Sequence, residues 1–493
     1  MSERNGLRYG LLGLALLILL ALLALVINRP DSSPTPAAAA ESNSIESLAA
    51  LGDQPPSRRD LNIQTWQTAE GAKVLFVEAR ELPMFDLQLT FAAGSSHDDG
   101  VAGLAMLTNA MLNEGVPGKD VGAIAAGFEN LGANFGNGAF RDMAIASLRS
   151  LSAADKREPA MQLFNQVIGQ PTFPDDALAR IKNQLLAGFE YQKQDPGKLA
   201  SLALFERLYG SHPYAHPSDG NAESIPSISR EQLQAFHAKA YTANNAIIAL
   251  VGDLSHSDAE ALASQVSAAL PQGPALPRIA QPQTPKPGLQ HIEFPSNQTH
   301  LMIAQLGIDR RDPDYAALYL GNQVFGGGGF GTRLMTEVRE KRGLTYGVYS
   351  GFSAMQARGP FMINLQTRAE LSDGTLQLVK SMLADFIKNG PTTDELNNAK
   401  RELAGSFPLS TASNAAIVGQ LGSMAFYDLP LSYLEDFMRD VQALSVAQVK
   451  TAMAKHLNPE ALVIVTAGPT VAQQELPPPT DNPAEQPSGV PEH

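Results

Sequence analysis

Few side chains in this sequence have a type and spacing suited to catalysis or to metal binding. The sequence has no cysteine, which excludes disulfides, thiol catalysis and cysteine-based metal sites. His212 and His216 have the i, i+4 spacing of a helical metal pair, but Pro213 and Pro217 interrupt any helix there. We expect both to be loop histidines. The remaining histidines are scattered, and no pair of carboxylates can be nominated as acid and base.

A run of glycines is the other local feature of the sequence. Gly326–Gly329 is not a P-loop, because no Gly-Lys-Ser/Thr follows it. The alternative to a substrate-contacting role for these glycines is a strained turn between a helix and the next element.

The elements that must position these residues occur twice. Four residues recur with a shift of 218 positions: Leu178, Lys182, Leu185 and Phe189 match Leu396, Lys400, Leu403 and Phe407. Four more recur with a shift of 216: Ser229, Gln232, Ala238 and Lys239 match Ser445, Gln448, Ala454 and Lys455. Because two stretches agree at nearly one shift, we infer a duplication that gives two homologous α+β domains. Each is expected to be an antiparallel-type sheet with helices packed on it.

Periodicity predicts the individual elements. The expected strands cover 74–78, 87–92, 140–151, 246–251, 291–294, 300–306 and 461–466. The expected helices cover 101–112, 121–131 and 315–325, and the segments 346–354 and 359–367 are expected to form a hairpin.

Length and composition fit a globular protein of several domains, with 493 residues, 44% of them hydrophobic and 17% charged. The net charge of −14 argues against a nucleic-acid partner, because a phosphate-binding face needs clustered Lys and Arg. Proline-rich stretches suggest the boundaries. The expected parts are a cytoplasmic stub and transmembrane anchor (1–28), a linker (29–60), a first domain (61–270), a linker (271–287), a second domain (288–470) and a disordered tail (471–493).

The amino terminus predicts a membrane anchor. Arg4 and Arg8 precede the uncharged run 9–28, which at ~1.5 Å per residue is long enough to span a ~30 Å hydrocarbon core. Basic residues before the run favour a cytoplasmic amino terminus. The alternative is a cleaved signal, with Ala37–Ala40 supplying small residues. We expect a single-pass protein of the bacterial inner membrane with most of the chain in the periplasm.

The segment Gly103–Leu112, with Glu129–Ala133 after it, resembles the motif helix of the insulinase (pitrilysin) zinc peptidases. In catalytic members this helix carries His-x-x-Glu-His. The two His ligate zinc, the Glu activates water, and a second Glu downstream completes the metal site. The positions here that match these ligands and the base are Met106, Asn109, Ala110 and, downstream, Ala187. The resemblance therefore implies that this chain holds no catalytic zinc.

The second half resembles the same family through its glycine-rich loop and the Arg-Glu-Lys-x-Gly-Leu-x-Tyr pattern at 339–346. In active enzymes the Arg and Tyr bind the substrate carbonyl or the oxyanion, and the residues at these positions here are Arg339 and Tyr346. A guanidinium and a phenol are good donors to developing negative charge. The alternatives are a surface ion pair for Arg339 and edge packing for Tyr346. The substrate-contacting residues that the resemblance implies are Gly326, Gly327, Gly328, Gly329 and Phe330. The resemblance covers about 61–470. It extends to two-chain members that divide the zinc motif and the Arg–Tyr pair between chains, and to the alpha subunit of mitochondrial processing peptidase.

The resemblance implies a non-catalytic subunit of a heterodimeric periplasmic zinc endopeptidase, inactive alone. No cofactor is expected in this chain. The zinc is expected in the partner, a homologous subunit that carries His-x-x-Glu-His. The implied substrate is a peptide or unfolded protein, bound in extended form by backbone hydrogen bonds to a sheet edge. The alternative is a non-proteolytic scaffold or peptide-binding protein of a membrane complex, against which the retained Arg339 and Tyr346 speak.

Overall fold

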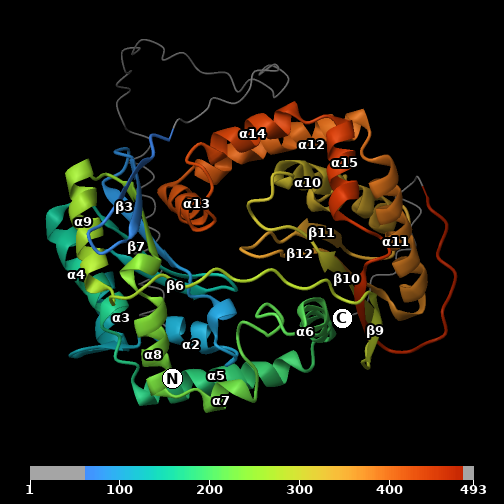
Figure 1. Ribbon diagram of the computed structural model, residues 1–493. Coiled ribbons are helices and arrows are strands. Elements are labelled where there is room, and N and C mark those ends of the chain that lie inside the picture. Colours follow the sequence, from blue (N-terminus) through green and yellow to red (C-terminus); the bar gives the residue numbers. More distant parts are fainter. Residues whose placement is uncertain (1–60, 481–493) are drawn as a thin grey trace, which may run out of the picture. The chain divides into compact units, whose positions relative to one another are not determined.

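Two β-sheets, one in each half of the sequence, form the framework of the structure, a computed structural model that describes residues 61–480 (Figure 1). The first sheet has the strand order β1-β2-β8-β3-β7-β6. Its strands are β1 (Gln64–Gln67), β2 (Lys73–Glu78), β3 (Met84–Phe91), β6 (Asn134–Ala139), β7 (Ala144–Leu151) and β8 (Ala246–Gly252). A separate two-stranded ribbon pairs β4 (Gly115–Val116) with β5 (Lys119–Asp120).

The second sheet has the order β11-β12-β10-β13-β9. Its strands are β9 (Gly288–Glu293), β10 (Gln298–Leu306), β11 (Val348–Phe352), β12 (Pro360–Arg368) and β13 (Val463–Gly468). The last strand of each half enters its sheet in the same way. It runs parallel to an early strand (β2 or β9) and antiparallel to the next one (β3 or β10). Each sheet is therefore mixed, which corrects the expectation of antiparallel-type sheets. The parallel pair arises because a long helical connection returns the last strand in that direction.

Helices fill the connections between the strands. Those of the first half are α2 (Leu104–Ala110), α3 (Val121–Glu129), α4 (Ala154–Gly169), α5 (Asp175–Gln192), α6 (Pro196–Tyr209), α7 (Ser224–Ser227), α8 (Arg230–Ala240) and α9 (His256–Ala269). Those of the second half are α10 (Tyr315–Asn322), α11 (Ser372–Asn389), α12 (Thr393–Ser406), α13 (Asn414–Phe426), α14 (Tyr433–Ala443) and α15 (Val446–His456). The second half also has two π-helical segments, η3 (Gln323–Gly327) and η4 (Met335–Glu340), and two short 3-10 helices, η5 (Ala369–Leu371) and η6 (Phe407–Thr411).

One helix from each half covers the sheet of the other half. Helix α6 packs on β10 and β13, and helix α13 packs on β3 and β8 (Figure 1). Strand β8 shows why the central strands are apolar on both faces. Leu250 points into the core of the first half, and Val251 points into the cluster formed with α13. This exchange buries apolar surface between the halves and joins them in one compact unit.

The repeated lysines explain part of the sequence duplication. Lys182 Nζ donates to the carbonyls of Pro226 and Ile228, and Lys400 Nζ donates to those of Gln442 and Leu444. In both halves the next residue is a serine that forms a capping box at the start of the following helix. The two lysines therefore hold the same turn in both halves.

The connecting segment 271–287 has no regular secondary structure but is hydrogen-bonded along its length. It contacts the first half through Asn245 Oδ1, which accepts from Leu276 N at 3.2 Å. It contacts the second half through Gln356 Oε1, which accepts from Ile279 N at 3.1 Å. The tail also differs from the expected disordered segment 471–493. Residues 471–480 lie along the second half, where backbone bonds such as Gln474 N to Glu370 O (2.7 Å) hold them.

The predicted localisation in the inner membrane needs correction. Within residues 61–480, no helix combines the length and the apolar character needed to cross a bilayer, so a single-pass membrane protein finds no support. The run 9–28, on which that prediction rested, lies outside the described residues, as do the linker 29–60 and the segment 481–493.

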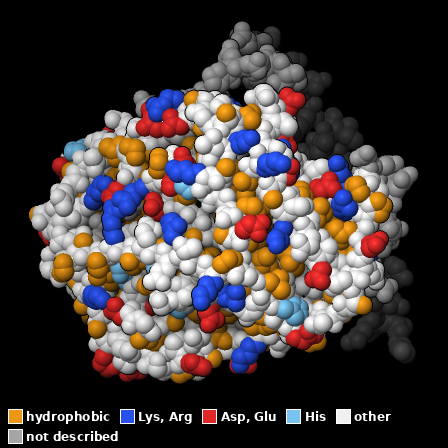
Figure 2. All heavy atoms as spheres, turned by 45° about the vertical axis from the view of Figure 1, so that its right-hand side comes forward, with side chains coloured by type: hydrophobic (Ala, Val, Ile, Leu, Met, Phe, Trp, Pro, Cys, Tyr) orange, Lys and Arg blue, Asp and Glu red, His pale blue; other side chains and the backbone are white. Residues whose placement is uncertain are grey.

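Surface charge is mixed where the second half faces the viewer in Figure 2. Basic and acidic side chains are interspersed across this face, with hydrophobic side chains between them. The face therefore presents no single-sign electrostatic field.

Candidate functional site

The residue at the position of the family's catalytic base is a core amide. Asn109, on α2, is 2% exposed. Its Nδ2 donates to the carbonyl of Ile145 at 3.1 Å and to the Tyr241 hydroxyl at 3.2 Å. Burial raises the pKa of Tyr241, so its phenol stays neutral. The amide therefore ties α2 to strand β7 and to the end of α8 instead of facing a substrate.

The other three aligned positions offer no better zinc ligands. Met106 and Ala110 are half-buried on α2, and Ala187 is exposed on α5. Zinc in proteins is bound by thiolate, imidazole and carboxylate groups, whereas these side chains are a thioether and two methyls. Helix α2 keeps its packing against β6, β7 and α8, so the motif helix has a structural role in this chain.

Arg339 is half-buried and forms a cluster with two exposed aromatic rings, those of Tyr346 and of Phe330, which follows the glycine loop. The Arg339 guanidinium carbon lies 5.0 Å from the centre of the Tyr346 ring and 4.7 Å from that of Phe330. The side chains of Tyr346 and Phe330 are 83% and 69% exposed. Such cation–π contacts orient a guanidinium that would otherwise move freely. The nearby acid Glu337 pairs with Arg342 and Lys341.

The backbone around this cluster is wound more loosely than an α-helix. Arg339 lies in η4, where Lys341 N donates to Thr336 O at 2.9 Å, the i to i+5 bond of a π-helix. A second π-helical segment, η3, leads into the glycine loop. A Cβ at Gly326 would lie 2.5 Å from Ser350 Oγ, and Gly329 has φ +79°, so larger residues at either position would shift this loop.

An ion pair anchors the segment between the glycine loop and Arg339. Arg333 Nε and Nη2 donate to the two carboxylate oxygens of Glu395 at 2.7 and 2.8 Å. The Arg333 guanidinium also lies over the ring of Phe386, at 4.9 Å. The hydrogen bond from Arg333 is the main reason that the pKa of Glu395 falls to about 2. The start of η4 is thereby fixed to α11 and α12.

A family model described as "Peptidase M16 inactive domain" matches residues 227–403. A crystal structure of a peptidase M16 inactive domain from Pseudomonas fluorescens is 74% identical in sequence, covers 85% of this chain and 100% of its own, and has a TM-score of 0.83. The chain belongs to the M16 peptidase family. It is a homologue of the inactive type, in agreement with the residues at 106, 109, 110 and 187.

Two proteins of Helicobacter pylori extend the comparison within the M16 family. The "Non-peptidase homolog YmxG" is 29% identical over 410 residues, which cover 80% of this chain and 91% of that protein. A crystal structure of a protease from the same species is 16% identical, covers 83% of this chain and 100% of its own, and has a TM-score of 0.76. Because its sequence identity is only 16%, the similarity to this protease shows a shared fold and nothing about the activity of this chain.

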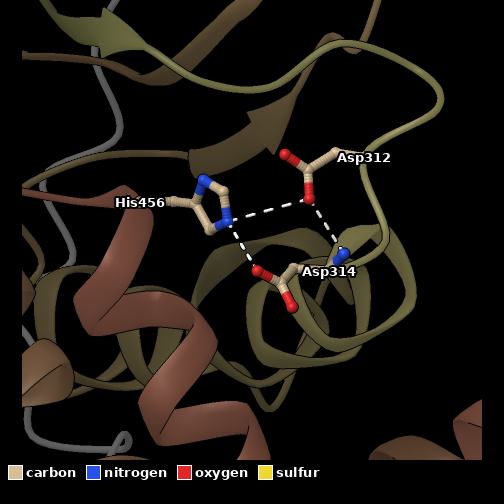
Figure 3. A group of neighbouring side chains, drawn as sticks. All are labelled: Asp312, Asp314 and His456. Atoms are coloured by element: carbon tan, nitrogen blue, oxygen red, sulfur yellow. Dashed lines mark hydrogen bonds and ion pairs between the residues drawn. The ribbon is translucent and has the colours of Figure 1, made fainter.

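One group of potential metal ligands occurs among the described residues, away from the M16 motif positions: Asp312, Asp314 and His456 (Figure 3). His456 Nε2 lies 2.8 Å from Asp314 Oδ2 and 3.8 Å from Asp312 Oδ1. Lys455 Nζ lies 2.6 Å from the same Asp314 oxygen. The group is thus an ion-pair network where α10 begins and α15 ends. It gives no support for a zinc site in peptidase chemistry.

His212 and His216 lie in the loop after α6, as expected for loop histidines. The sequence reading missed Asp142, which joins the two halves beside them. Asp142 Oδ2 accepts from the backbone N of Gln356 at 2.7 Å, and Oδ1 accepts from the Tyr214 hydroxyl. Burial raises the pKa of Asp142. No sequence signal marks this residue, because its partners come from distant elements.

Proposed function

We propose that this M16 chain is the non-catalytic subunit of a two-chain zinc endopeptidase. A partner that carries His-x-x-Glu-His supplies the zinc, its ligands and the base. This chain supplies Arg339 and Tyr346 as hydrogen-bond donors to the substrate carbonyl and to the oxyanion. The observation that carries the proposal is the contact of the half-buried Arg339 guanidinium with the exposed rings of Phe330 and Tyr346.

The exposure of the two aromatic rings favours a role in binding. Tyr346 is 83% exposed and Phe330 is 69% exposed, although large aromatic side chains are usually buried in cores. Two contacts fix the segment that leads to Arg339. They are the Arg333–Glu395 ion pair and the packing of Gly326 against Ser350. A preorganised donor pair on a rigid support is the arrangement that transition-state stabilisation needs.

The substrate can be held by the strand that follows Tyr346. Strand β11 begins at Val348 and is an edge strand, with β12 as its neighbour in the sheet. An edge strand can add an extended peptide through its outward backbone groups. In β11 the Val348 N–H already donates to Met335 Sδ and the Ser350 carbonyl accepts from Asn322 Nδ2, so a peptide has to add beyond these two groups. Binding through the peptide backbone depends little on the side chains of the substrate. This suits an endopeptidase that cleaves unfolded segments of varied sequence. Gly327, Gly328, Gly329 and Phe330 border the same segment and are proposed as further substrate contacts. Gly326 lies in η3 and is buried against Ser350 and Leu334, which corrects its expected role as a substrate contact.

The rival role is a scaffold without proteolysis. The two roles differ in what they require of Arg339 and Tyr346, because a scaffold has no use for donors to an oxyanion. The test mixes the chain with a zinc-motif partner and follows cleavage of an unstructured peptide. Cleavage that exceeds that of the partner alone, and that is lost with Arg339→Ala, supports the proposal. Equal cleavage with and without this chain supports the scaffold.

A further inference from the structure

The segment 471–480, here called the C-terminal strap, is held against the second half by side chain and backbone. Gln473 Oε1 accepts from Asp373 N at 3.0 Å, and Gln473 Nε2 donates to Ala369 O at 3.0 Å. Leu476 packs on the second-half core above Gly374, where a Cβ would lie 2.8 Å from Leu476 Cγ. These contacts direct the strap across η5 and the start of α11.

The far end of the strap reaches the turn between Arg339 and Tyr346. Arg342 Nη1 donates to Pro477 O at 2.9 Å, and Thr480 N donates to Lys341 O at 2.8 Å. Lys341 and Arg342 come directly after η4, the segment that carries Arg339. The hydroxyl of Thr480 also donates to Lys341 O, at 3.4 Å. Three hydrogen bonds therefore join the strap to the turn that connects the two donors.

Arg342 also connects the strap to η4 itself. Its Nε donates to Glu337 Oε1 at 2.9 Å, while its Nη1 holds Pro477. The side chains of Arg342 and Glu337 are largely buried, at 18% and 25% exposure. One guanidinium thus links the π-helical segment η4 to the strap.

We propose that the C-terminal strap, through Arg342, positions the Arg339–Tyr346 donor pair. The proposal rests on the proposed function for its catalytic consequence, but not for its structural one. Without the strap, the turn 341–345 loses the strap's bonds at Lys341 and Arg342, and the bonds that still hold it include the one from Gly343 N to Arg339 O at 2.9 Å and the one from Thr367 Oγ1 to Leu344 O at 2.6 Å. The guanidinium and the phenol then sample more separations, so fewer molecules present both donors to a substrate at once.

The structural test uses hydrogen exchange on the isolated full-length chain. Arg342→Gln is expected to raise amide exchange in 339–346 about tenfold, as loss of roughly one hydrogen bond implies, while exchange in the first sheet stays unchanged. Arg342→Lys, which keeps the charge, is expected to restore part of the protection. A chain that ends at Thr470 should behave like Arg342→Gln, and a chain that ends at Thr480 should behave like wild type. Unchanged exchange in Arg342→Gln would overturn the strap proposal, whatever any cleavage assay shows.

The functional test adds the zinc-motif partner. Arg342→Gln is expected to lower kcat about tenfold with little change in KM, because the donors are present but poorly placed. If Arg339→Ala loses activity while Arg342→Gln keeps full activity despite faster exchange, the strap proposal fails and the proposed function stands. If neither variant changes the cleavage rate, the proposed function fails, and with it the catalytic part of the strap proposal.

Discussion

The Arg339 guanidinium carbon lies 5.0 Å from the centre of the Tyr346 ring. Arg339 is in the π-helical segment η4, and Tyr346 precedes the edge strand β11. The contact brings a guanidinium and a phenol together on the surface. A partner's zinc cleft placed against this surface would receive both donors from this chain.

Removing either donor is expected to slow a two-chain enzyme. In a mixture with a zinc-motif partner, Arg339→Ala and Tyr346→Phe should each lower kcat about 10²-fold, the usual cost of losing one oxyanion donor. Steady-state peptide cleavage measures the effect, and size-exclusion chromatography checks that the subunits still associate. Tyr349→Phe is the matched control, since Tyr349 is also an exposed tyrosine, at 49%. Equal rates for Tyr346→Phe and Tyr349→Phe would contradict a catalytic role for the Tyr346 hydroxyl.

Asn109 is expected to matter for stability and not for catalysis. Asn109→Ala removes donors to Ile145 O and Tyr241 in a buried site, which should cost about 2 kcal/mol in the free energy of unfolding. Tyr241→Phe should cost about 1 kcal/mol, and the double variant less than the sum, because the two share a bond. Urea unfolding measures all three. Additive losses would show that the Asn109–Tyr241 bond contributes little.

The Arg333–Glu395 pair predicts a pH dependence of stability. The pKa of Glu395 is lowered from 4.5 to about 2 in the folded chain. The folded state therefore favours the ionised form, and this stabilisation is complete above pH 4.5 and lost as the pH falls towards 2. Glu395→Gln should lower the urea midpoint at pH 7, and its difference from wild type should shrink below pH 4.5. Asp394→Asn, on the same helical turn, is the control. A difference that stays constant down to pH 3 would contradict the assignment.

The matched lysines predict matched effects in the two halves. Lys182→Met and Lys400→Met each remove two hydrogen bonds to carbonyls while keeping an apolar stem. Each should cost about 1 kcal/mol of stability, since the sites are partly exposed. The exposed Lys388→Met serves as the control in thermal unfolding. A loss in one half only would mean that the two turns do not have the same role.

The sequence predicted most of the core elements, because strands such as β10 and helices such as α3 have strong periodicity and clear apolar faces. It missed β6, whose glycines and asparagines carry little strand signal although pairing with β7 defines it. It also missed the bond between Asn109 and Tyr241, which joins residues 132 positions apart. The strap was misread as disorder because proline-rich sequence lacks periodicity, whereas Gln473, Leu476 and Arg342 hold it through tertiary contacts.

Zinc content and peptide cleavage of the purified chain, alone and mixed with a His-x-x-Glu-His partner, test the central claim most directly. We expect no bound zinc and no cleavage for the chain alone, and cleavage above that of the partner alone on mixing. Stoichiometric zinc or cleavage by the isolated chain would contradict the assignment of Met106, Asn109, Ala110 and Ala187 to the lost metal and base positions. No gain on mixing would contradict the division of the site between two chains.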